Sequence, residues 1–168
     1  PMLRLALVGA AVIALTAPLH AQGAQVAFGG MAQDTDAPVE VSADQLEVNQ
    51  SDGTALYTGN VVIGQGEMRL AAPRVLVVYV EGQGRIDRLE ATGGVTLVSG
   101  EEAAEAERAD YDITAGTVVM SGNVLLTQGQ NVLTSERMLV DLEGGTAQME
   151  GRVRTVIRSQ DETGQGQN

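Results

Sequence analysis

The sequence predicts an all-β protein, an elongated and slightly open sandwich of repeated, bent antiparallel strands. Three observations lead to this fold class: a Gly-x-Val motif recurs along the chain, a Gln or Arg lies at a fixed distance from it, and apolar and polar residues alternate between these motifs. Alternation with a period of two is typical of strands with one buried face. A recurring segment of this length indicates a structural unit that buries its apolar face only beside its neighbours.

The two signatures define a unit of about 29 residues. The motif occurs at intervals of 34, 29 and 29 residues, beginning at Gly59, Gly93, Gly122 and Gly151. The second signature lies 15 residues after each of the first three motifs, at Arg74, Arg108 and Arg137, and Gln45 has the equivalent place before the first. Each unit therefore contains two strands, one after each signature.

Both kinds of strand show one apolar face. After Gln or Arg the alternating apolar residues are Leu46 and Val48; Val75, Val77 and Tyr79; Ala109, Tyr111 and Ile113; and Met138, Val140 and Leu142. After Gly-x-Val they are Val61 and Ile63, Val95 and Leu97, Val124 and Leu126, and Val153. Glycine inside a strand marks a bend, and Pro73 is excluded from a continuous central ladder. We therefore expect each strand to bend and to contribute to two facing sheets.

The segment 101–110, "EEAAEAERAD", favours a helix by propensity. The repeat register favours a strand, because Ala104 and Arg108 fall where Leu70 and Arg74 fall. We predict a strand from about Ala103, since tertiary context often overrides propensity.

Composition excludes several classes of function. The chain of 168 residues has a net charge of −12, no Cys and one His. A nucleic-acid partner is not expected, because binding to it needs a cationic surface. Disulfides and thiolate metal sites are excluded. His20 lies in a segment that we expect to be removed, so Ser-His-Asp triads and His-based metal sites are not expected either. We expect neither a cofactor nor a metal.

The N-terminus resembles a cleavable secretory signal peptide. Arg4 precedes an uncharged run from Leu5 to Ala17, Pro18 breaks this run, and Ala21 offers a small residue for cleavage, with Ala24 as a second choice. The alternative is a membrane anchor, but a spanning helix needs about 20 apolar residues. The predicted organisation is a signal peptide (1–21), a flexible segment (22–38), one β domain (39–158) and a disordered tail (159–168).

The stretches "SADQLEV" (42–48), "YTGNVVI" (57–63) and its echo "MSGNVLL" (120–126) resemble the OstA-like family of periplasmic lipopolysaccharide-transport proteins. This resemblance implies a slightly open β-jellyroll whose interior holds lipid acyl chains. It also implies a bridge of stacked domains between two membranes. Its partners would be lipopolysaccharide, through lipid A, and LptC-like and LptD-like proteins of the same fold at the two ends.

On this hypothesis the apolar strand face is the lipid-binding interior. The residues expected to line it are Val61, Ile63, Met68, Leu70, Val75, Val77, Val95, Leu97, Tyr111, Val124, Leu126, Met138 and Val140. The alternative is that these residues only pack on each other, as most apolar strand faces do.

The charged groups also have two interpretations. The signature arginines could neutralise lipid phosphates, or they face outward and pair with nearby carboxylates. The acidic group of Glu101, Glu102, Glu105 and Glu107 could hold calcium or supply catalytic acids, but it lacks the turn glycines of a calcium loop. A solvated strand face is the simpler interpretation.

The sequence therefore favours a soluble periplasmic carrier that is not an enzyme. Two alternatives are an LptC-like scaffold anchored in the membrane and a carbohydrate-active enzyme that uses two carboxylates. The first and last strands, about Val39 to Val48 and Thr146 to Ile157, are expected to lack full partners. Free edges of opposite charge favour head-to-tail self-association.

Overall fold

The computed structural model describes residues 24–27 and 35–158, and every regular element in these ranges is a β-strand. The strands are β1 (Ala24–Ala27), β2 (Glu40–Ser42), β3 (Gln45–Asn49), β4 (Thr54–Gln65), β5 (Met68–Tyr79), β6 (Ile86–Ser99), β7 (Glu102–Asp112), β8 (Thr117–Gln128), β9 (Asn131–Asp141), β10 (Thr146–Glu150) and β11 (Arg154–Val156). The predicted all-β class is confirmed. In the ranges described, no helix is long and apolar enough to cross a membrane.

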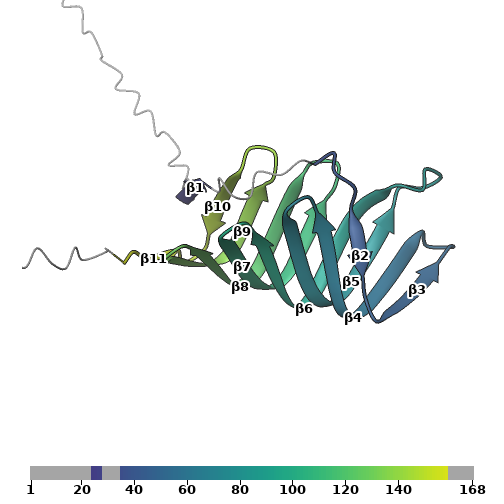
Figure 1. The fold of residues 1–168 in the computed structure, drawn as a ribbon, viewed down its shortest axis with the longest axis horizontal. Helices are drawn as coiled ribbons and strands as arrows, with labels where there is room; N and C mark the ends of the chain where they lie inside the picture. The colour runs from purple at the N-terminus through teal and green to yellow at the C-terminus, as the bar shows by residue number, and fades with distance from the viewer. Residues whose placement is uncertain (1–23, 28–34, 159–168) are drawn as a thin grey trace, which may run out of the picture.

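All strands belong to one antiparallel sheet with the order β1-β10-β9-β8-β7-β6-β5-β4-β2 (Figure 1). At one end, β3 pairs with the first half of β4 and β2 with the second half. At the other end, β10 pairs with the second half of β9 and β11 with the first half. The pairs β2–β3 and β10–β11 are therefore each equivalent to one bent strand. Within the ranges described, the sheet is a row of eight bent strands with β1 added at one edge.

Each long strand bends at its middle, where the pairing register shifts. The bends divide the sheet into two half-sheets whose apolar faces share one core. Half-sheet 1 contains β3, β10, the first halves of β4, β6 and β8, and the second halves of β5, β7 and β9. Half-sheet 2 contains β2, β11 and the remaining halves. The predicted two facing sheets with bent strands shared between them are therefore present.

The Gly-x-Val motif forms the bend. Both residues before the Val have positive φ in all four copies: Gly59 and Asn60, Gly93 and Gly94, Gly122 and Asn123, and Gly151 and Arg152. The glycine is required because another side chain lies on it. A Cβ added at Gly122 would lie 2.6 Å from Glu107 Oε2. The equivalent neighbours are Asp44 at Gly59, Pro73 at Gly93 and Glu136 at Gly151.

Side-chain contacts hold three of these four bends. Asn60 Nδ2 donates to Asp44 Oδ2 at 2.9 Å, and Asn123 Nδ2 donates to Glu107 Oε1 at 2.5 Å. At the last bend, Arg152 forms an ion pair with Glu136, with Nε 3.2 Å from Oε1. The carboxylate residue comes directly before the Gln or Arg signature in each case. The two signatures are therefore the two sides of one contact, repeated along the sheet.

A single row of register partners crosses the sheet beside the bends. It consists of Gln45, Thr58, Arg74, Thr92, Arg108, Ser121, Arg137 and Glu150. Every signature residue therefore pairs with the residue before a Gly-x-Val motif. The repeat in the sequence corresponds to the same strand-pairing register in every unit of the sheet.

The segment 101–110 is in a strand as predicted, since β7 begins at Glu102. The expectation that Leu46, Val48 and Val153 are covered is wrong: their exposed fractions are 55%, 61% and 39%. Leu46 and Val48 pair with Tyr57 and Ala55 and so share the inner face of β4, but no described strand covers them at the sheet edge. The segment expected to be flexible contains β1, which pairs with β10.

Candidate functional site

The candidate site is the apolar interior between the two half-sheets. All thirteen residues expected to line it lie in the core, each with at most 2% of its surface exposed. Small aliphatic side chains dominate it, and its buried polar residues are Gln65, Ser99 and Ser135. The structure brings the expected residues together in one continuous core.

Other core residues were missed by the sequence analysis. Leu89, Val118, Met120 and Met149 are all buried. Leu89 and Val118 lie four positions before a Gly-x-Val glycine, and Met120 and Met149 lie two positions before one. Continuing the period-two pattern backward from each motif would have identified these four residues.

A polar contact crosses the interior. The Tyr111 hydroxyl on β7, in half-sheet 1, donates to Gln65 Oε1 on β4, in half-sheet 2, at 2.5 Å. Gln65 Nε2 donates in turn to the carbonyl oxygens of Thr35 and Ala37, each at 3.0 Å. Gln65 therefore connects the second half of β4 to β7 and to the segment that leads into β2. The sequence placed Tyr111 inside but contained no signal for Gln65.

The Tyr111–Gln65 contact predicts a measurable effect on stability. Tyr111→Phe is expected to lower the free energy of unfolding by about 1–3 kcal/mol, because Gln65 Oε1 stays buried and loses its donor. Burial raises the pKa of Tyr111 above 10.0, partly offset by the hydrogen bond with Gln65. The folded protein thus holds this proton more tightly than the unfolded chain. Its contribution is complete below pH 10.0 and is lost as the pH rises through the folded-state pKa.

Urea unfolding between pH 8 and pH 11 measures both effects. Tyr111→Phe should be less stable at pH 8 and should lose less stability above pH 10. Burial also raises the pKa of Tyr57, with a further contribution from Tyr79, so a smaller alkaline loss should remain. The control is the double variant Tyr111→Phe/Gln65→Leu. It removes both partners of the hydrogen bond and so leaves no buried Gln65 oxygen without a donor. An unchanged pH profile in Tyr111→Phe would show that Tyr111 does not carry this dependence.

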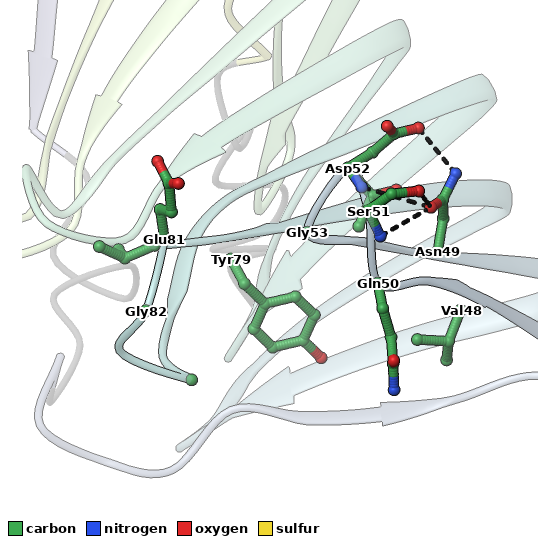
Figure 2. Close-up of a pocket in the computed structure, with 12 residues that line it drawn as sticks. Val48, Asn49, Gln50, Ser51, Asp52, Gly53, Tyr79, Glu81 and Gly82 are labelled. Atoms are coloured by element: carbon green, nitrogen blue, oxygen red, sulfur yellow. Dashed lines mark hydrogen bonds between the residues drawn. The ribbon is translucent and has the colours of Figure 1, made fainter.

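Part of the inner face is left uncovered at the β3 end. The β3–β4 turn and the β5–β6 loop surround a hollow of about 520 Å³ lined by Val48, Tyr79 and polar residues of both loops. Figure 2 shows the Tyr79 side chain between the two loops. The Asn49 side chain holds the first loop by accepting from the amides of Ser51 and Asp52, at 3.1 and 3.3 Å. Together with Leu46 and Val48, this end presents inner-face apolar surface to the outside.

The signature arginines lie outside the interior. Arg108 pairs with Asp110 at 2.6 Å and Glu90 at 3.3 Å, and Arg137 pairs with Glu150 at 3.0 Å. Asp110, and then Glu90, raise the pKa of Arg108. Arg74 is exposed and has no ion pair among the residues described. Arg108 and Arg137 therefore face outward and pair with carboxylates, as the second interpretation states. Arg74 faces outward but has no such pair among the residues described.

The acidic residues of β7 make different contacts. Glu107 covers Gly122 and accepts from Asn123, whereas Glu102 accepts from Gln128 Nε2 at 3.2 Å. Glu105 is exposed. Within residues 24–27 and 35–158, no three His, Cys, Asp or Glu side chains are grouped so that they could hold a metal ion.

The repeated bends and the apolar interior agree with a comparison to known families. Residues 40–146 match the family described as LptA/(LptD N-terminal domain) LPS transport protein. The chain belongs to this family. The resemblance to OstA-like proteins is thereby confirmed, and the family is one of transport proteins rather than of enzymes.

Individual relatives agree with this assignment. An uncharacterised protein of Rhizobium meliloti (strain 1021) is 33% identical over 119 residues, which are 67% of this chain and 63% of that protein. The lipopolysaccharide export system protein LptA of Escherichia coli (strain K12) is 32% identical over 50 residues, 30% of this chain and 27% of LptA. The matched regions thus span less than two thirds of these relatives.

A solved structure confirms the jellyroll fold. Crystalline LptH of Pseudomonas aeruginosa, described as the LptA homologous periplasmic component of the lipopolysaccharide transport device, superimposes with a TM-score of 0.67. The sequence identity is 20%, and the match covers 76% of this chain and 99% of LptH. At this identity the likeness concerns the fold.

Proposed function

We propose that this chain is a periplasmic carrier that binds lipopolysaccharide and forms part of a bridge from the inner to the outer membrane. The acyl chains would lie between the two half-sheets. The observation that carries this proposal is the continuous aliphatic interior, with inner-face residues exposed at the β3 end, in a member of a lipopolysaccharide-transport family. Each methylene exposed to water costs about 0.8 kcal/mol, so a tail crossing an aqueous gap needs such a surface throughout.

The bent sheet offers a way to admit a lipid into a packed interior. The ladder hydrogen bonds lie within each half-sheet, and the register shifts at the bends. Separating the half-sheets therefore leaves these ladders intact. The acyl chain would then pack against the apolar side chains that otherwise pack on each other across the interior. The hydrogen bond between Tyr111 and Gln65 is a described polar contact that would have to break.

Photocrosslinking at two adjacent valines tests the proposal. Val77 is fully buried on the inner face of β5, whereas the side chain of Val78 points to the opposite face. A photoreactive residue at position 77 should crosslink to lipopolysaccharide in living cells, and one at position 78 should give little or no product. Immunoblotting for lipopolysaccharide measures both. Equal products at the two positions would exclude an interior route.

The export route and anchoring of the chain form a second test. We propose that the signal peptide is cleaved after Ala21 and that the mature protein is soluble in the periplasm. Residues 1–23 lie outside the described ranges, so this stays a prediction. Mass spectrometry of the exported protein should give a chain that begins at Gln22. A mass that retains residues 2–17 would instead favour the membrane-anchored scaffold.

We also propose that the two ends bind proteins of the same fold, LptC-like at one and LptD-like at the other, and further copies of this chain. The outer edges of β2, β3 and β11 have no strand partner within the described ranges. Exposed inner-face residues lie at both ends, Leu46 and Val48 at one and Val153 at the other. A heterologous contact between the ends extends the sheet without closing, which suits a bridge.

A further inference from the structure

We propose that β1 caps the edge of β10 in the same chain, at the place that β3 of another copy would occupy. End-to-end assembly would then require β1 to leave. This inference rests on the end-to-end association in the proposed function. It adds a competitor inside the chain that controls when the edge becomes available.

The repeat fixes the register that a new strand must adopt on β10. Inside the sheet, the residue before a Gly-x-Val motif always pairs with a signature residue on the next strand: Thr58 with Arg74, Thr92 with Arg108, and Ser121 with Arg137. Glu150 is the residue before the last motif, and Gln45 is the first signature residue. The same rule therefore places Gln45 of a second copy opposite Glu150. Met149, Gln148, Ala147 and Thr146 would then face Leu46, Glu47, Val48 and Asn49 of that copy.

Strand β1 already occupies this position. Its residues pair antiparallel with the same four residues of β10: Ala24 with Met149, Gln25 with Gln148, Val26 with Ala147, and Ala27 with Thr146. The backbone of Ala24–Ala27 thus stands where the rule places residues 46–49 of a second copy. Both strands cannot pair with this edge of β10 at the same time.

A second copy offers a larger pairing surface than β1 does. β1 has four residues and pairs only with β10, so it covers the half-sheet 1 part of this edge. A second copy presents β3 to β10 and β2 to β11, so it would cover both parts. It would also bury the exposed Leu46 and Val48. Its Glu40 and Asp44 would approach Arg152, Arg154 and Arg158 of the first copy. β1 has the advantage of being attached, which favours it at low protein concentration.

Deleting β1 tests the inference. If β1 covers the edge in about nine chains of ten, removing it should lower the apparent dissociation constant for self-association about tenfold. Sedimentation velocity of the exported chain and of a variant lacking residues 24–27 measures this constant. Equal association of the two proteins would overturn the inference while leaving the bridge intact. Absence of association in both would overturn the inference together with the self-association part of the proposed function.

A disulfide that holds β1 on β10 tests the opposite case in the full chain. The protein has no Cys, so Gln25→Cys with Gln148→Cys places a single bond between register partners of β1 and β10. The oxidised form should remain monomeric, and reduction should restore association. The control is Leu139→Cys with Gln148→Cys, which links β9 to β10 and leaves β1 free. Association of the oxidised β1-locked form would overturn the inference.

A crosslink between copies tests the register. In the variant lacking β1, Glu47→Cys with Gln148→Cys should form a disulfide-linked oligomer. The two positions lie on β3 and β10 with β4 to β9 between them, on the order of 30 Å apart, so the bond cannot form within one chain. Glu47→Cys with Arg154→Cys is the matched control and should not crosslink, because β2 rather than β3 would approach β11. Equal crosslinking of both pairs would overturn the register.

Discussion

Ile63→Asp is expected to abolish lipopolysaccharide crosslinking at position 77 and to lower the free energy of unfolding by about 4 kcal/mol or more. Ile63 is fully buried on the inner face of β4. The substitution removes its methyl groups and leaves a carboxylate without a partner in an aliphatic interior. Urea unfolding and the crosslinking assay measure the two effects. Leu126→Asp, at an equally buried position on β8, should behave in the same way.

Two variants separate lipid binding from stability. Val62→Asp places the same charge on the neighbouring residue, which points outward with 37% of its surface exposed, and should retain crosslinking. Val61→Thr changes the inner face with little change in shape. This substitution should lower the free energy of unfolding by about 1–2 kcal/mol. The protein should remain folded, and its crosslinking to lipopolysaccharide should decrease. Normal crosslinking in a folded Val61→Thr or Ile63→Asp protein would argue against an interior path for the acyl chains.

Gly122→Ala is expected to lower the free energy of unfolding by about 2–4 kcal/mol. Part of this effect, roughly 1–2 kcal/mol, is the cost of a left-handed conformation for Ala. The remainder comes from Glu107, whose Oε2 lies 2.6 Å from the position of the added Cβ. Chemical unfolding at pH 7 measures the total.

Gly129→Ala is the matched control for this bend. Gly129 also has a positive φ, 58°, but a Cβ added there has no atom within 4 Å. Gly129→Ala should therefore lower the free energy of unfolding only by the cost of the left-handed backbone conformation, roughly 1–2 kcal/mol. The double variant Gly122→Ala/Glu107→Ala should recover part of the difference between the two glycines. If Gly122→Ala and Gly129→Ala were equally destabilised, the carboxylate over the glycine would have no role in requiring it.

The repeat was readable from the sequence because the same local chemistry recurs in every unit. Glycine at a fixed place and apolar residues at every second position predict a bent strand with one buried face. This pattern was strong enough to place β7 correctly against its helix propensity. It also predicted the thirteen core residues, since burial in a sheet follows from alternation alone.

The contact behind the repeat could not be predicted in the same way. Glu107 and Gly122 are far apart in the sequence, and only the pairing of β7 with β8 brings them together. An acidic residue before the signature, at Asp44, Glu107 and Glu136, was a visible regularity. Its partner was not visible, because the sequence does not state which strand lies beside which.

The sequence by itself determined the fold class, the repeat, the inner face and the family. These properties follow from local periodicity and glycine placement, which every unit repeats. Only the tertiary structure decided where this inner face is left uncovered, as at Leu46 and Val48, and that Gln65 spans the interior to Tyr111. It alone paired β1 with β10, at the opposite end of the chain. Edges and long-range hydrogen bonds depend on which segments meet in space, and alternation along the chain carries no record of that.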